Sequence, residues 1–159
     1  MAKSHRYTKV FHYTPMLIGE HTHTVDPKRR VSLPAKFRKA LGKGVVVTHG
    51  LDGSLSIFSF QKWKEMVGKL ETLSLGSADS RAFARFMLAG ASEVDVDSLG
   101  RILIPEYLAA YAGIEKEAVV IGVNDRAEMW EPTKWANYKK VVTGKADELA
   151  ERLGAIGAL

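Results

Sequence analysis

The sequence contains no cysteine. Disulfide bonds, cysteine-ligated zinc sites and a thiol nucleophile are therefore excluded, as is common in a reducing compartment. No apolar run reaches the roughly 20 residues that span a bilayer, and residues 3–13 are too polar for a secretory signal peptide. We therefore expect a cytoplasmic protein with no membrane partner.

Acidic residues are scarce in the first part of the chain. Residues 1–44 contain 10 Lys and Arg against only Glu20 and Asp26, a balance of +8, whereas residues 45–159 contain 13 against 16, a balance of −3. A basic excess confined to one segment is typical of proteins that bind a polyanion. With 159 residues and 46% apolar content, the chain can bury one ordinary core.

One short motif occurs twice, at residues 26–34 and 97–105. Each copy has Asp, then Arg four positions later, then Pro after another four. At an offset of 71 positions, Val25, Asp26, Arg30, Pro34 and Gly42 match identical residues at Val96, Asp97, Arg101, Pro105 and Gly113. A single Asp-x-x-x-Arg would carry no information, but two copies with matching tails indicate an internal repeat of about 40 residues.

Both copies predict the same local structure. The Asp side chain can accept hydrogen bonds from backbone N–H groups two or three residues on, and Pro27 or Gly100 favours a tight turn. A strand should follow; residues 102–104 are apolar on both faces, which favours fuller burial than in the first copy. A helix should then begin at Pro34 or Pro105.

The remaining pattern completes each repeat and adds helices. Glycines should end the two short helices, with Phe37, Leu41, Leu108 and Ala112 on their buried faces. Two strands joined by a polar turn should follow each helix, at 45–48 and 54–58 and again at 118–121 and 128–130. Apolar spacing predicts helices at 61–73 and 79–88 and a further helix after Trp135, of which 147–153 is the clearest part. Trp63 and Trp135 are expected as core anchors, and residues 154–159 as a frayed end.

These features resemble the MraZ family of bacterial transcriptional regulators. The resemblance rests on the two tandem Asp-x-x-x-Arg motifs, the run 19–26, the stretch 85–93 and the residues Glu128-Met129-Trp130, and it extends from about Met16 to Arg152. One departure is Arg29, which stands where the family usually has glycine before the motif arginine.

The resemblance implies an α+β fold in which two tandem SpoVT-AbrB-like units form a pseudo-twofold, swapped-hairpin β-barrel with flanking helices. The expected segments are a basic extension (1–19), the first unit (20–66), a helical connector (67–90), the second unit (91–134) and a C-terminal helix and tail (135–159). It also implies a nucleoid-associated DNA-binding regulator, of the repressor type, of the division and cell-wall gene cluster. The regulator would act from a closed homo-oligomeric ring, without cofactor or metal.

The residues suggest how double-stranded DNA would be bound. We expect Lys28, Arg29 and Arg30 on an exposed turn, followed by the basic helix residues Lys36 and Arg38. Because Glu93 and Asp95 precede the second copy, the hypothesis is that Arg30 reads DNA while Arg101 serves the structure. Structural roles are also assigned to Asp26, Asp97, Gly100, Pro34 and Pro105. A ring that repeats one contact favours operators with short direct repeats.

Alternative interpretations remain at several positions. The protein could instead be a ring-forming scaffold whose Asp-x-x-x-Arg pairs only clamp turns, and residues 1–15 could be a DNA-contacting arm or a leader without function. His21 and His23 have metal-ligand spacing, but surface histidines are the preferred interpretation. His49 and Asp52 lack the partners of a catalytic set and are interpreted as turn residues, so no enzyme is expected.

Overall fold

The computed structural model describes residues 15–159, so all of the proposed arm at residues 1–15 except Pro15 lies outside this range. The strands are β1 (Leu17–Thr24), β2 (Arg30–Ser32), β3 (Gly44–His49), β4 (Leu55–Ser59), β5 (Ser92–Asp95), β6 (Arg101–Leu103), β7 (Glu117–Asn124) and β8 (Ala127–Trp130). The helices are α1 (Ala35–Leu41), α2 (Phe60–Glu71), α3 (Ala78–Ala89), α4 (Glu106–Ala112), α5 (Pro132–Gly144) and α6 (Ala146–Ala155), with a short 3₁₀ turn η1 (Leu51–Gly53).

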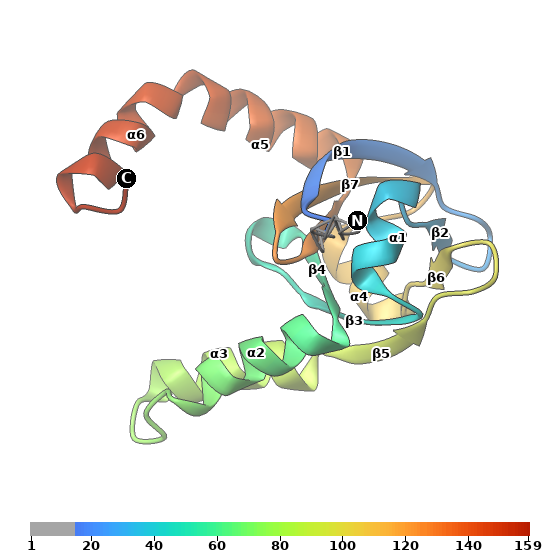
Figure 1. Cartoon of the computed structure of the whole chain (residues 1–159), viewed down its shortest axis with the longest axis horizontal. Helices are drawn as coiled ribbons and strands as arrows, with labels where there is room; N and C mark the ends of the chain where they lie inside the picture. The colour runs from blue at the N-terminus through green and yellow to red at the C-terminus, as the bar shows by residue number, and fades with distance from the viewer. Residues whose placement is uncertain (1–14) are drawn as a thin grey trace, which may run out of the picture.

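Six of the strands form one antiparallel sheet in the order β1-β7-β8-β4-β3-β5. The counterpart strands in the two repeats are β1 and β5, β7 and β3, and β8 and β4. Exchanging each strand for its counterpart gives the same order read from the other edge of the sheet. Pairing registers repeat as well: Val45 pairs with Val94, and the counterparts Ala118 and His23 also pair. The predicted α+β class and the two tandem units therefore agree with the structure, and strands of the two repeats interleave (Figure 1).

The two motif strands pair with each other and form a second, two-stranded sheet, the β2–β6 ribbon. Its central pair is Val31 and Ile102, which are counterparts in the repeat and have fully buried side chains. Two backbone hydrogen bonds extend the pairing, from Leu33 N to Gly100 O and from Ile104 N to Arg29 O, both 2.9 Å. The turn of each motif is thereby fixed against the end of the other motif.

The short helices α1 and α4 follow the ribbon and cover the core as predicted. Phe37 and Leu41 on α1, and Leu108 and Ala112 on α4, are buried. Each helix begins one residue after its proline, because the backbone of Pro34 and Pro105 is extended, with ψ of 135° and 142°. Each ends as expected at a glycine with positive φ, 85° at Gly42 and 71° at Gly113.

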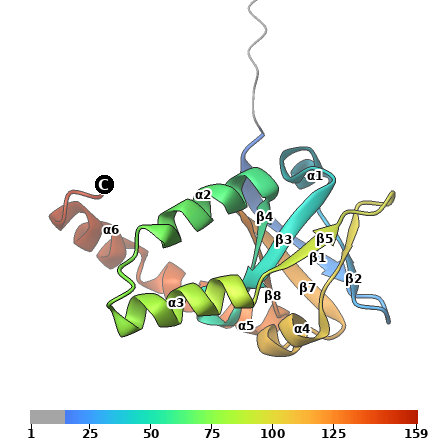
Figure 2. The ribbon, with the colours of Figure 1, turned by 90° about the horizontal axis from the view of Figure 1, so that it is seen from below.

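The remaining helices extend away from the sheet in two arms, the α2–α3 hairpin and the α5–α6 pair (Figures 1 and 2). Trp63 and Trp135 are only half-buried, so their prediction as core anchors was wrong. They instead cover Phe58 and Trp130, with ring centroids 5.6 and 5.2 Å apart. Helix α6 continues to Ala155, past the predicted start of fraying. Among residues 15–159 no helix has the length and apolar character needed to cross a membrane.

Candidate nucleic-acid interface

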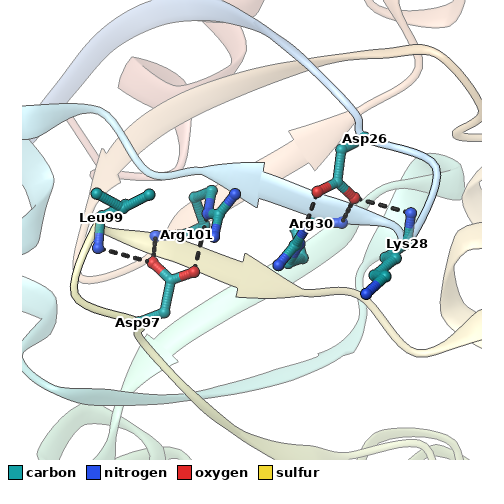
Figure 3. A network of polar contacts seen from close by, with 6 residues as sticks. All are labelled: Asp26, Lys28, Arg30, Asp97, Leu99 and Arg101. Atoms are coloured by element: carbon teal, nitrogen blue, oxygen red, sulfur yellow. Dashed lines mark hydrogen bonds and ion pairs between the residues drawn. The ribbon is translucent and has the colours of Figure 1, made fainter.

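The first turn (residues 26–30) is held by the side chain of Asp26. Its Oδ1 accepts hydrogen bonds from Lys28 N at 2.9 Å and Arg30 N at 2.8 Å, and its Oδ2 accepts one from Arg30 Nε at 2.6 Å. The predicted bond two residues on is thus confirmed, and a further bond reaches the fourth residue. One carboxylate therefore satisfies two backbone donors and orients the Arg30 guanidinium (Figure 3).

The second turn (residues 97–101) repeats this arrangement at the other end of the ribbon (Figure 3). Asp97 accepts hydrogen bonds from Leu99 N at 3.0 Å, Arg101 N at 2.8 Å and Arg101 Nε at 2.8 Å. The side chains of Arg30 and Arg101 are 35% and 28% exposed. The local geometry therefore gives the two arginines the same role in their turns, and any functional difference must come from their surroundings.

The turn contacts also keep both carboxylates charged. The pKa of Asp26 lies below its usual value, chiefly because Arg30 N donates a hydrogen bond to the carboxylate, with the Arg30 side chain adding to the effect. The pKa of Asp97 is lowered in the same way by Arg101. At neutral pH each turn therefore contains an ionised Asp paired with the Nε of its Arg.

Arg29 occupies the place of a glycine and adopts a glycine-like backbone. Its φ is +62°, and φ at its counterpart Gly100 is +76°. A left-handed conformation costs a residue with a Cβ about 1 to 2 kcal/mol. The Arg29 side chain gives a compensating contact, because its Nε donates to Ile104 O at 3.1 Å. The first turn thus keeps the left-handed backbone of the second turn although it has Arg29 in place of glycine.

Arg38 provides the matching contact on the other side of the ribbon. Its Nε donates to Leu33 O at 3.0 Å, and Leu33 is the counterpart of Ile104. The guanidinium lies over Gly100: a Cβ placed there would be only 2.2 Å from the guanidinium carbon. Ala109, the counterpart of Arg38, is small and buried. On one side of the ribbon, Gly100 leaves room for the Arg38 guanidinium, which contacts Leu33 O. On the other side, Arg29 itself supplies the guanidinium that contacts Ile104 O, and the counterpart of Arg38 is the small Ala109.

The outer face of the β2–β6 ribbon carries Arg30, Ser32, Arg101 and Leu103. These residues alternate with the buried Val31 and Ile102, so they point away from the core. Across the ribbon, Arg30 lies opposite Leu103, and Ser32 lies opposite Arg101. The major groove of B-DNA is wide enough to admit a two-stranded β-ribbon of this kind.

The structure places the other predicted DNA contacts around this ribbon. Lys28 is exposed at the tip of the first turn, and Lys36 and Arg38 are exposed on α1. Arg29 is half-buried because its side chain reaches across to Ile104. Lys28, Arg29 and Arg38 therefore lie at the ribbon, whereas Lys36 is placed only on the helix that follows it.

Sequence reasoning missed Leu103 as a surface residue. The prediction of fuller burial for residues 102–104 was wrong at Leu103: Ile102 and Ile104 are fully buried, but Leu103 is 45% exposed. Strand alternation sets this pattern, because one face of β6 packs on the core and the other faces solvent. The internal repeat could have predicted this exposure, because the offset of 71 aligns Leu103 with the polar residue Ser32.

Of the three histidines in the described region, His21 and His49 pack against aromatic side chains, whereas His23 is half-buried and its pKa is lowered chiefly by that burial. His21 contacts the edge of the Phe37 ring, with centroids 5.5 Å apart. His49, predicted to lie in a turn, ends β3 and stacks on Phe86 at 4.8 Å, whereas Asp52 lies in the 3₁₀ turn as expected. Within residues 15–159 no group of three or more His, Asp or Glu side chains is arranged to hold a metal ion.

Comparison with known proteins assigns the chain to a family. The family model described as "MraZ protein, putative antitoxin-like" matches residues 16–86 and 87–153. The chain belongs to the MraZ family. Each matched MraZ segment contains one Asp-x-x-x-Arg turn, one motif strand and the short helix that follows it.

Curated MraZ relatives cover nearly the whole described chain. A protein named "Transcriptional regulator MraZ" from Caldanaerobacter subterraneus subsp. tengcongensis is 49% identical over 138 residues, or 87% of this chain and 96% of the relative. Proteins with the same name from Acetivibrio thermocellus and Thermoanaerobacter sp. strain X514 are 44% and 47% identical. They align with 89% and 87% of this chain and with 99% and 96% of their own lengths. The relatives are thus named as regulators of transcription.

Proposed function

We propose that this chain is a sequence-specific DNA-binding transcriptional regulator that inserts the β2–β6 ribbon into the major groove. The observation that carries the proposal is the outer face of the ribbon, where Arg30 and Arg101 are both oriented by a carboxylate of their own turn. Arginine is the side chain most used for base contacts in the major groove, and an oriented guanidinium binds with less loss of freedom. The names of the MraZ relatives support the same function.

Within this proposal the basic residues have different roles. Arg30 uses its terminal nitrogens to contact a guanine edge, while Asp26 holds its Nε. Lys28 at the turn tip, Lys36 and Arg38 on α1, and Arg29 beside the ribbon contact phosphates and set the position of the ribbon. Asp26, Asp97, Gly100, Arg101 and the two helix-preceding prolines maintain the geometry.

We further propose that the protein acts as a homo-oligomeric closed ring. A ring presents its ribbons in one rotational sense, which favours an operator of short direct repeats rather than a palindrome. The proposed target is the promoter of the division and cell-wall gene cluster, with repression as the outcome and the nucleoid of the cytoplasm as the location. The interleaved sheet and the ribbon together would form the swapped-hairpin barrel of each subunit, consistent with the symmetric strand order.

A second candidate function is a ring-forming scaffold. In each Asp-x-x-x-Arg pair the Asp carboxylate accepts a hydrogen bond from the Arg Nε of the same turn, as it would in a purely structural clamp. The two helical arms expose apolar side chains, including Phe83 and Leu88 on α3 and Leu149 and Leu153 on α6, which suit contacts between subunits. In this case assembly would be retained but specific DNA binding would be absent.

Footprinting on the DNA upstream of the protein's own gene distinguishes these functions. We expect protection of several short boxes repeated in one direction, together with a salt-dependent gel shift. A footprint on a palindrome alone would contradict the ring geometry. Assembled protein that gives no footprint and no specific shift would contradict the regulator and favour the scaffold.

A further inference from the structure

The two outer ends of the ribbon differ in one pair of residues. Arg30 lies opposite Leu103, whereas its counterpart Arg101 lies opposite Ser32. Leu103 is 45% exposed, although Ile102 and Ile104 on either side of it are fully buried. Each arginine of the ribbon therefore has a different cross-strand neighbour, an apolar one beside Arg30 and a polar one beside Arg101.

This exposed leucine is placed where a base edge would lie. It belongs to a three-residue strand whose inner side chain anchors the ribbon, so its position on the outer face is set by the buried Ile102. Side chains directly opposite each other on a strand pair lie within about 5.5 Å at Cβ. An element that brings Arg30 to a guanine thus brings Leu103 to a neighbouring base pair.

Thymine is the base that presents an apolar group in the major groove, its C5-methyl. Contact between a leucine and this methyl removes apolar surface of both partners from water. A cytosine at the same place would present an amino donor that the leucine cannot satisfy, and Ser32 at the other end could accept or donate a hydrogen bond. The two ends of the ribbon are therefore suited to different bases.

We propose that Leu103 is a specificity residue that contacts a thymine C5-methyl next to the guanine read by Arg30. The proposal rests on the proposed function, because it requires the ribbon to enter the major groove. It also explains how a nearly twofold ribbon chooses a direction on DNA. The difference between Leu103 and Ser32 adds to the difference between the two turns, so that one orientation of a box is favoured. All subunits of an assembly then bind boxes that point the same way.

Deoxyuridine substitution tests the proposal, because it removes only the C5-methyl of thymine. A footprinted operator is prepared with each thymine replaced in turn, and binding is measured by fluorescence anisotropy. For the wild-type protein we expect one thymine per box whose replacement lowers affinity about three- to tenfold for each engaged box. For Leu103→Ser we expect a similar loss of affinity on the unmodified operator. Replacing the sensitive thymine by deoxyuridine should lower the affinity of this variant no further.

Two further variants complete the test. The exchange Ser32→Leu with Leu103→Ser should move the sensitive thymine to the opposite end of the box, on the other strand. Leu75→Ser is a matched control, because Leu75 is 84% exposed in the turn between α2 and α3, far along the chain from the ribbon. It should keep wild-type affinity and wild-type sensitivity to deoxyuridine.

The outcomes that contradict the proposal are distinguishable. Specific binding with no deoxyuridine-sensitive thymine, or sensitivity that persists in Leu103→Ser, would overturn the role of Leu103 while leaving the regulator intact. Disassembly of Leu103→Ser in size-exclusion chromatography would also overturn it and would assign Leu103 to a subunit contact. Absence of any specific binding by the wild-type protein would instead contradict the proposed function itself.

Discussion

The first and second turns share a clamp but differ in what surrounds it. In both, one aspartate binds two backbone N–H groups and the arginine Nε, with distances that agree within 0.2 Å between Arg30 and Arg101. The first turn adds Lys28 and Arg29, where the second has Leu99 and Gly100. The comparison teaches that the repeat preserves backbone geometry, whereas the chemistry presented to a partner changes from one copy to the other.

The structure also makes the difference in charge between the two turns smaller than the sequence predicts. Glu93 and Asp95 lie on β5 before the second turn, as the sequence indicated. However, Arg38 of the first repeat lies over Gly100 of the second turn. Antiparallel pairing of β2 with β6 causes this, since it brings the end of each motif beside the turn of the other. The second turn is therefore less acidic than its own sequence suggests, and the four predictions below test how far the turns differ.

The largest expected effect concerns the motif arginines. Arg30→Ala should abolish specific DNA binding, because a bidentate arginine–guanine contact carries about 1 to 3 kcal/mol of discrimination and several subunits would each lose it. Arg101→Ala should retain measurable specific binding. Arg30→Ala should keep its oligomeric size and nearly the wild-type melting temperature, because exposed ion pairs add little stability. Arg101→Ala should instead lower the melting temperature or disturb assembly first, because Arg101 is assigned a structural role in the second turn. Equal loss of binding in the two variants, measured by gel shift, would show that the ribbon reads DNA symmetrically.

The second prediction concerns the basic residues unique to the first turn. The double substitution Lys28→Ala with Arg29→Gly should weaken binding to all DNA sequences to a similar degree. It should also reduce the slope of log affinity against log salt by about 0.9 for each phosphate that the variant no longer neutralises. Glycine is used at position 29 because it permits the positive φ. Lys64→Ala with Lys140→Ala, two exposed lysines on the arms, is the control and should leave the slope unchanged.

The third prediction compares the left-handed residues before each arginine. Gly100→Ala should lower the free energy of unfolding by about 1 to 2 kcal/mol, because φ is +76° and the added Cβ would displace Arg38. Arg29→Gly should be nearly neutral, since relief of the same strain offsets the missing hydrogen bond to Ile104 O. Urea unfolding at fixed protein concentration measures both. A larger destabilisation in Arg29→Gly than in Gly100→Ala would refute this account of the exchange between Arg29 and Arg38.

The smallest expected effect is on acid stability. The folded state lowers the pKa of Asp26 and Asp97 below the usual 3.8. Their contributions to the free energy of unfolding are therefore complete above pH 3.8 and are lost as the pH falls through the lower pKa of the folded state. Asp26→Asn and Asp97→Asn retain a hydrogen-bond acceptor but no charge, so each should flatten the acid dependence of unfolding measured from about pH 7 to pH 3. The two flattenings should be similar, because the hydrogen bonds are the same in both turns. A flattening in only one variant would show that the clamps differ in strength.

The sequence alone determined those features that depend on a few neighbouring residues. The motif aspartates accept the predicted local hydrogen bonds, and the glycines at 42 and 113 end their helices with positive φ. The buried faces of α1 and α4 followed from helical periodicity. These outcomes could be predicted because turn geometry, helix ends and amphipathic spacing are set within about one turn of the chain.

The long-range neighbours of the motif residues depend on the tertiary fold. The pairing of β2 with β6 joins segments about 70 residues apart, and it alone placed Leu103 outward beside Arg30 and Arg38 over Gly100. Tertiary packing outside the ribbon likewise left Trp63 half-buried while Trp130 is 3% exposed. Strand side chains alternate between faces, so which face meets solvent depends on what packs on each side of the finished sheet. That choice is not encoded in any short stretch of sequence.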